Sequence, residues 1–106
     1  MCIRDRGRAL AERDVRRRSI VALLRGLYDE RLTVRTAIDE VARTGETAAQ
    51  EALDAAVATQ RAGKGEFLRV LTARRDLALL RSRRLELTRR EWSIVGDIVA
   101  LTGELP

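Results

Sequence analysis

The pattern in this chain whose residue types could hold a ligand is Gly63–Lys64–Gly65. A glycine followed by lysine closes the phosphate-binding loop of many nucleotide-binding proteins, in which backbone N–H groups and the lysine surround phosphate oxygens. That loop also needs an earlier glycine and a Ser or Thr directly after the lysine. Here Ala58 occupies the first of these positions and Gly65 the second. The pattern therefore does not predict a phosphate loop and is typical of a turn between two helices.

The side chains that most often perform acid–base, nucleophilic or metal chemistry are scarce in this sequence. It contains no histidine, and Cys2 is its single cysteine, so an internal disulfide and a thiolate zinc site are both excluded. We identify no paired buried carboxylates and no nucleotide loop. The sequence therefore predicts a protein that is not an enzyme, with no catalytic residue, no metal site and no cofactor.

The net charge of +5 is concentrated at the start of the chain. Residues 1–18 carry seven arginines and three acidic side chains, whereas the rest of the chain carries 14 basic and 13 acidic residues. An almost neutral body with few aromatic residues is a poor match for nucleic-acid binding, which needs a basic face. An RNA- or DNA-binding hairpin is the weakest of the binding hypotheses.

Length and composition favour long helices over a thick globular core. The chain has 106 residues, its aromatic residues are Tyr28, Phe67 and Trp92, and 35% of its residues are charged. So short a chain with so few large side chains has a small core, so we expect a partner or an oligomer. No run of 18 apolar residues is present to form a membrane-spanning helix.

We predict five segments along the chain. Residues 1–8 form a non-native or disordered start, because the run from Met1 to Arg6 resembles a translated sequencing-adapter remnant, and the chain is then a fragment of a longer protein. Residues 9–62 form a first long helix, 63–65 the tip of a hairpin, 66–102 a second long helix and 103–106 a C-terminal tail.

The first helix is predicted from apolar residues that recur every seven positions, as along the seam of a coiled coil. The series is Ile20, Leu27, Val34, Val41, Ala48, Ala55 and Ala62, with Leu24, Ile38 and Ala52 lying between its members. Thr47 and Gln50 have the spacing of a capping box, which leaves open a separate helix beginning there. Because the series keeps its phase past Gly45, we favour one continuous helix with a weak point at that glycine.

The second helix carries two seven-residue series. One is Leu71, Ala78, Leu85, Trp92 and Val99, and the other is Ala73, Leu80, Leu87, Ile94 and Leu101. The offset of two residues places the series roughly 150 to 160° apart around the helix. A simple two-helix hairpin uses one such seam, so this helix is expected to have a neighbour on each side. A helix in a closed wall of helices has this geometry, and so does a central helix of an ordinary bundle.

The predicted tip has a recognisable turn chemistry. Gly63 is placed to end the first helix in a left-handed conformation, where a Cβ would be costly. Glu66 would put a negative charge in the first turn of the second helix, where the helix dipole favours it. Phe67, Leu68 and Leu71 would then form an apolar patch just beyond the turn.

The segment QRAGKGEFLRVLTARRDL, from Gln60 to Leu77, resembles the second hairpin tip of TolC-type outer-membrane efflux proteins. The likeness rests on the tip glycine and the apolar stretch and leucine that follow it. The upstream AQEALDA (residues 49–55) and the closing ALTG (residues 100–103) resemble the family at matching distances, so that the likeness covers about residues 9–105.

The resemblance implies an all-α antiparallel helical hairpin, coiled-coil-like, that belongs to a trimeric α-barrel. It implies a passive export duct, localised in the outer membrane, with this segment in the periplasm. The implied partners are two further copies of the full-length protein and a periplasmic adaptor protein that leads to an inner-membrane pump. The tip, adaptor-contact and entrance positions it implies are Gln60, Arg61, Gly63, Lys64, Gly65, Glu66, Phe67, Leu68, Leu71 and Thr72.

The sequence departs from the family at three positions near the entrance. Gln60 stands where the family has an aromatic residue. Gly65 and Thr72 stand where some members have the basic and acidic partners of an ionic latch. A charge-latched entrance is therefore not predicted. A free-standing helical coiled-coil adaptor or scaffold is the alternative hypothesis, and it predicts a soluble, helical chain of defined oligomeric state.

Overall fold

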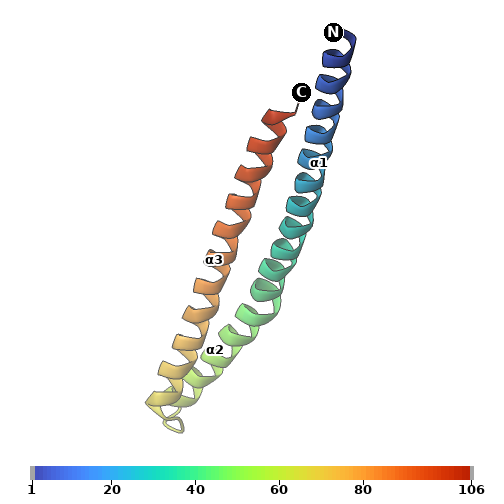
Figure 1. Ribbon diagram of the computed structural model, residues 1–106. Coiled ribbons are helices and arrows are strands. Elements are labelled where there is room, and N and C mark those ends of the chain that lie inside the picture. Colours follow the sequence, from blue (N-terminus) through green and yellow to red (C-terminus); the bar gives the residue numbers. More distant parts are fainter. Residues whose placement is uncertain (1, 106) are drawn as a thin grey trace. The chain divides into compact units, whose positions relative to one another are not determined.

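The computed structural model describes residues 2–105, and all regular structure within this range is helical (Figure 1). Helix α1 spans Cys2–Glu40 and passes directly into a π-helical segment, η1, at Val41–Glu46. Helix α2 spans Thr47–Arg61, and helix α3 spans Phe67–Glu104 after the turn. The all-α class predicted from the sequence is confirmed.

The helices extend further than the predicted segments. Residues 2–8, which we expected to lie outside the helices, belong to α1, and residues 103 and 104 of the expected tail belong to α3. Glu66 directly precedes α3 and is not in its first turn. Met1 and Pro106 lie outside the described residues.

The described chain divides into two compact units. The first combines residues up to Leu32 with residues from Trp92 onward, so it holds the start of α1 and the end of α3. Its buried side chains are Ile20 on α1 and Ile94 and Ile98 on α3, spaced by about one helical turn on α3. This unit therefore closes a narrow apolar seam between two helical segments.

The second unit, Thr33–Glu91, contains the turn and the helical segments on both sides of it. An ideal Cβ on Gly45 would lie 3.3 Å from Leu80 Cδ2, and Arg35 Nη1 lies 3.5 Å from Glu91 Oε1. The later position before the turn, Gly45, thus lies beside the earlier position in α3, Leu80. The helical segments on the two sides of the turn are therefore antiparallel. The buried residues of this unit are Val34, Ile38, Ala56, Val70, Leu77 and Leu87.

Segment η1 joins α1 to α2 without a break in the helical backbone. The backbone angles remain helical on both sides, with φ −64° and ψ −46° at Glu40 and φ −63° and ψ −48° at Thr47. The Thr47 hydroxyl donates to the Ala42 carbonyl oxygen at 3.5 Å, five residues back, and Gln50 Nε2 donates to Asp54 Oδ1 at 3.0 Å. The capping-box interpretation of Thr47 and Gln50 is therefore wrong, because neither side chain caps a new helix.

The seven-residue series predicted for the first helix does not continue as a buried seam beyond η1. Ala48, Ala55 and Ala62 are all exposed, whereas Ala56 is only 5% exposed and Ala49 is half-buried. A π-helical turn holds one residue more than an α-helical turn, so the inward-facing positions shift by one after Val41. The predicted register of α2 was wrong for this reason.

Helix α3 buries Leu87 and Ile94 of one predicted series, half-buries the other three members of that series and leaves the second series exposed. Val70 and Leu77, which are also buried, belong to neither predicted series. In the second unit Leu87 is 5% exposed, while Leu85, two residues away, is 58% exposed. In the first unit Ile94 is buried, while Trp92 is 70% exposed. The series Leu71, Ala78, Leu85, Trp92 and Val99, called here the outer series, is exposed at every member, of which three lie in the second unit and two in the first.

Candidate functional site

The turn between α2 and α3 is a Schellman motif. The Gly63 N–H donates to the Gln60 carbonyl at 2.9 Å, and the Lys64 N–H donates to the Thr59 carbonyl at 3.1 Å. These are the two bonds that satisfy the last free carbonyls of a helix when the next residue is left-handed. Gly63 has φ +73°, which confirms its predicted left-handed conformation. The turn is therefore fixed by backbone bonds and by the absence of a Cβ at this position.

The turn is also packed closely against the end of α2. An ideal Cβ on Gly65 would lie 3.0 Å from the Gln60 backbone nitrogen and 3.0 Å from Thr59 Cγ2. Any larger residue at 65 would push the chain away from α2. On the other side, the Arg69 N–H donates to the Glu66 carbonyl at 3.1 Å, so Glu66 supplies the first backbone acceptor for α3.

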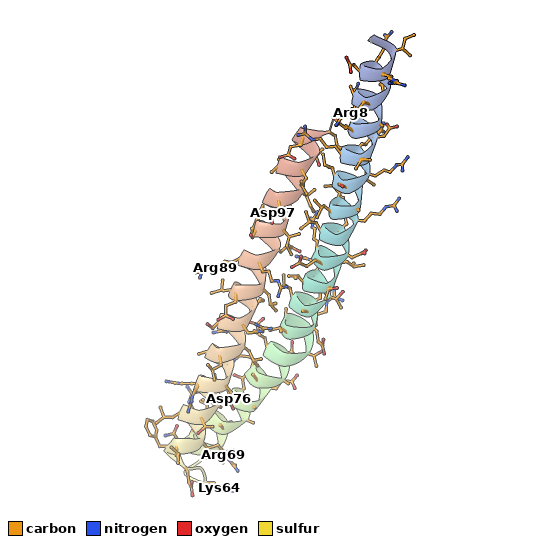
Figure 2. All side chains as sticks on the ribbon, viewed as in Figure 1. Arg8, Lys64, Arg69, Asp76, Arg89 and Asp97 are labelled. Atoms are coloured by element: carbon orange, nitrogen blue, oxygen red, sulfur yellow. The ribbon has the colours of Figure 1, made fainter. Side chains whose placement is uncertain are left out.

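The residues predicted for the tip fall into two groups by exposure. Lys64 and Arg61 are exposed on the turn and at the end of α2, and Figure 2 shows Lys64 at the turn itself. Gln60 and Gly65 are half-buried. The remaining members are exposed: Gly63, Glu66, Phe67, Leu68, Leu71 and Thr72. The apolar patch of Phe67, Leu68 and Leu71 is thus open to solvent in the described chain.

An open groove of about 770 Å³ runs between α2 and α3 in the second unit, next to the turn. Its α2 wall is made almost entirely of small side chains, because four alanines line it. Its α3 wall adds two leucines and the charged groups of Arg69 and Asp76, which Figure 2 labels on this part of α3. The lining residues are Gly45, Ala49, Ala52, Ala55, Ala56, Thr59, Glu66, Leu68, Arg69, Thr72, Ala73, Asp76 and Leu80.

The groove brings together three of the predicted tip residues, namely Glu66, Leu68 and Thr72. Arg61, Gly63, Lys64, Phe67 and Leu71 are not among its lining residues. Arg69 and Asp76 also line the groove, and the sequence did not predict them as site residues. Arg69 lies three residues before Thr72, and Asp76 lies four residues after it. Residues at these spacings share one face of a helix, so this spacing could have indicated that they belong to the site.

An ion pair joins η1 to α3 one residue beyond Gly45, which lines the groove. Arg84 Nε lies 2.9 Å from Glu46 Oε2 and 3.1 Å from Glu46 Oε1. The Glu46 side chain is 15% exposed and that of Arg84 is 44% exposed, so the pair is partly shielded from water. By contrast, Arg83 and Glu86 form a fully surface pair on α3, at 3.6 Å. The first pair therefore ties the π-helical segment to its neighbour.

The groove and the apolar patch beside it are suited to binding another surface through non-covalent contacts. Small residues form one wall of the groove, apolar side chains stand exposed beside it, and isolated charges lie at its edge. Among the described residues there is no cluster of three or more side chains suited to hold a metal ion. The arrangement can receive an apolar surface with a few polar contacts.

Comparison with known proteins gives no assignment. No family model matches this chain, and no curated protein or solved structure matches it. Within residues 2–105, none of the helices is long and apolar enough to cross a membrane. The function must therefore be inferred from the surface that the helices present.

Proposed function

We propose that this chain forms one helical hairpin in the wall of a TolC-type export channel, with its turn at the periplasmic entrance. In this role it is a passive part of a duct and carries out no reaction. The full-length protein would be a trimer in the outer membrane, and the hairpin would contact a periplasmic adaptor that leads to an inner-membrane pump.

The observation that carries the proposal is the exposed outer series of α3. A helix in a closed wall has a neighbour on each side, and α3 has apolar residues on two nearly opposite faces. The inner face is covered within each unit, by the buried seam around Leu87 in one and Ile94 in the other. The outer face, with Leu85 and Trp92, is the surface that an adjacent helix of the wall would cover.

The geometry at the turn supports the second part of the proposal. The Schellman motif holds a compact turn, and Phe67 and Leu68 are 62% and 66% exposed directly after it. An exposed apolar patch beside a small-residue groove is suited to a helical partner, as in other helix-in-groove contacts. The adaptor is the partner that the family resemblance implies for this place.

Site-specific photo-cross-linking tests whether the outer series is covered. A photoreactive amino acid is placed at Leu85 or, as the matched control, at Leu87, in the protein produced from its native gene. We expect position 85 to give adducts with another hairpin or another subunit, because its side chain faces outward. Position 87 should react only within its own hairpin.

Two results would count against the channel. Equal patterns from positions 85 and 87 would show that the outer series has no partner. Adducts from position 85 that form only a defined oligomer of a soluble 106-residue chain would instead favour the free-standing scaffold.

A further inference from the structure

Helix α2 carries two stripes of small residues that differ by one position. The stripe that meets α3 contains Ala49 and Ala56, which are half-buried and buried. The adjacent stripe contains Ala48, Ala52 and Ala55, which are all exposed. One residue corresponds to a rotation of about 100° and a rise of about 1.5 Å along an α-helix. The same sequence therefore offers α3 two surfaces of small residues, of which the observed one also carries the half-buried Leu53 and Val57.

Segment η1 lies where a change between these stripes would have to begin. Its π-helical turn holds one residue more than an α-helical turn, which is what brings Ala49 and Ala56 inward. If the hydrogen bonds of η1 changed to the α-helical pattern, each residue of α2 would move into the place of the next one. Ala48 and Ala55 would then replace Ala49 and Ala56 against α3.

The interface between α2 and α3 has room for this rotation. Ala52 and Ala55, from the exposed stripe, already border the open groove together with Ala49 and Ala56. Each of these side chains is a methyl group, so none presents a bulky obstacle as the stripes exchange. Leu53 and Val57, which are both half-buried, are the larger apolar side chains that would leave the interface, so the rotated register buries less apolar area.

Contacts around η1 distinguish the observed register from the rotated one. The Glu46 carboxylate is held by Arg84 Nε at 2.9 Å, and the Gly45 backbone approaches the Leu80 side chain. Both residues turn with α2, so a shift of one position would carry the Glu46 carboxylate away from Arg84. At the other end of α2, the turn would have to move with the helix, because the Gly63 and Lys64 N–H groups donate to carbonyl groups of its last turn.

We propose that η1 is a register switch, which lets α2 present either the Ala49–Ala56 stripe or the Ala48–Ala55 stripe to α3. The Glu46–Arg84 ion pair favours the observed register. The rotated register would turn Gln60 and Arg61 at the end of α2 and reshape the groove beside the turn. The switch is a property of the second unit alone, and it does not depend on the proposed channel function.

Single cysteines at positions 55 and 56 report the two registers in opposite ways. In the full chain with Cys2→Ser, Ala56→Cys should react slowly with an alkylating reagent and Ala55→Cys should react quickly, by about tenfold or more. Arg84→Ala removes the contact that favours the observed register. We expect the cysteine at 56 to react faster in this background and the cysteine at 55 to react more slowly. Arg83→Ala, which breaks only the surface pair with Glu86, is the matched control and should change neither rate.

The opposite changes in reaction rate at positions 55 and 56 distinguish a register switch from a loss of stability. A hairpin that was merely destabilised by Arg84→Ala would expose both cysteines and raise both rates. That result, or no change at either position, would overturn the proposal.

Deletion of Thr44 is an independent test of the register switch, and it also applies if the Arg84→Ala variant fails to fold. The deletion removes the extra residue, so an unbroken α-helix would keep the Ala49–Ala56 stripe inward. We expect the cysteine at 56 to react several-fold more slowly, relative to Leu87→Cys, which lies outside α2. A change of the reaction rate by the same factor at positions 56 and 87, or no change at either position, would contradict the switch.

Discussion

Leu87→Ala is expected to lower the free energy of unfolding of this chain by about 2 to 4 kcal/mol, whereas Leu85→Ala should change it by less than about 0.5 kcal/mol. Leu87 is 5% exposed and lies in the seam of the second unit, so its loss removes buried apolar area and leaves a cavity. Leu85 is 58% exposed on the same helix, and its truncation leaves the seam intact. Urea unfolding followed by circular dichroism measures both changes.

The pair forms a matched test because both changes are the same substitution, two residues apart on α3. Intrinsic helix propensity changes equally in the two variants, so the difference reports burial. A similar loss for both variants would mean that the outer face of α3 is covered in the isolated chain. A negligible loss for both would mean that the seam observed here is not formed in solution.

Gly63→Val is expected to cost about 1 to 3 kcal/mol in the free energy of unfolding and to disorganise the turn. Gly63 has φ +73°, a conformation that places a Cβ against the following carbonyl, and a β-branched side chain tolerates it least. No side chain lies within 4 Å of an ideal Cβ at this position, so the cost comes from the backbone and not from a clash.

Gly63→Asn is the control for this prediction, because asparagine adopts the left-handed conformation more readily than other residues with a Cβ. The asparagine variant should keep most of the stability and the same pattern of slow amide exchange at Gly63 and Lys64. Valine and asparagine variants of equal stability would show that the left-handed turn is not maintained in solution.

The fold could be predicted largely because two strong patterns agree. The seven-residue apolar series predicted two long helices, and Gly63 between them predicted a left-handed turn, which the structure confirms. The two series on α3 predicted apolar faces on nearly opposite sides of the helix, each with a neighbour, and the described chain covers one of these faces. Leu87 and Leu85 show this division of inner and outer faces directly.

The register of α2 could not be predicted, for a physical reason. Alanines occupy positions 48, 49, 52, 55 and 56, so the pattern of small residues fits either of two faces. The extra residue of η1, with its contacts from Gly45 to Leu80 and from Glu46 to Arg84, sets the observed face. Such contacts between distant positions leave no periodic signal in the sequence.

The groove beside the turn was also only partly predictable. Glu66, Leu68 and Thr72 were assigned from the family resemblance of the segment around Gly63, and the groove does contain them. Arg69 and Asp76 line it as well, because α3 brings them onto the same face. The exposed position of Phe67 and Leu71 outside the groove depends on where α3 begins, which the sequence places only approximately.

The coding sequence upstream of the codons for residues 1–10 distinguishes a channel segment from a free-standing protein, because a channel wall needs more than one hairpin. For a channel segment, we expect the reading frame to continue upstream into strand-like segments and an earlier helical hairpin that also ends in a glycine turn. A stop codon in frame, followed by a ribosome-binding site directly before Met1, would contradict the channel. The exposed outer series of α3 would then belong to a small helical protein that assembles by itself.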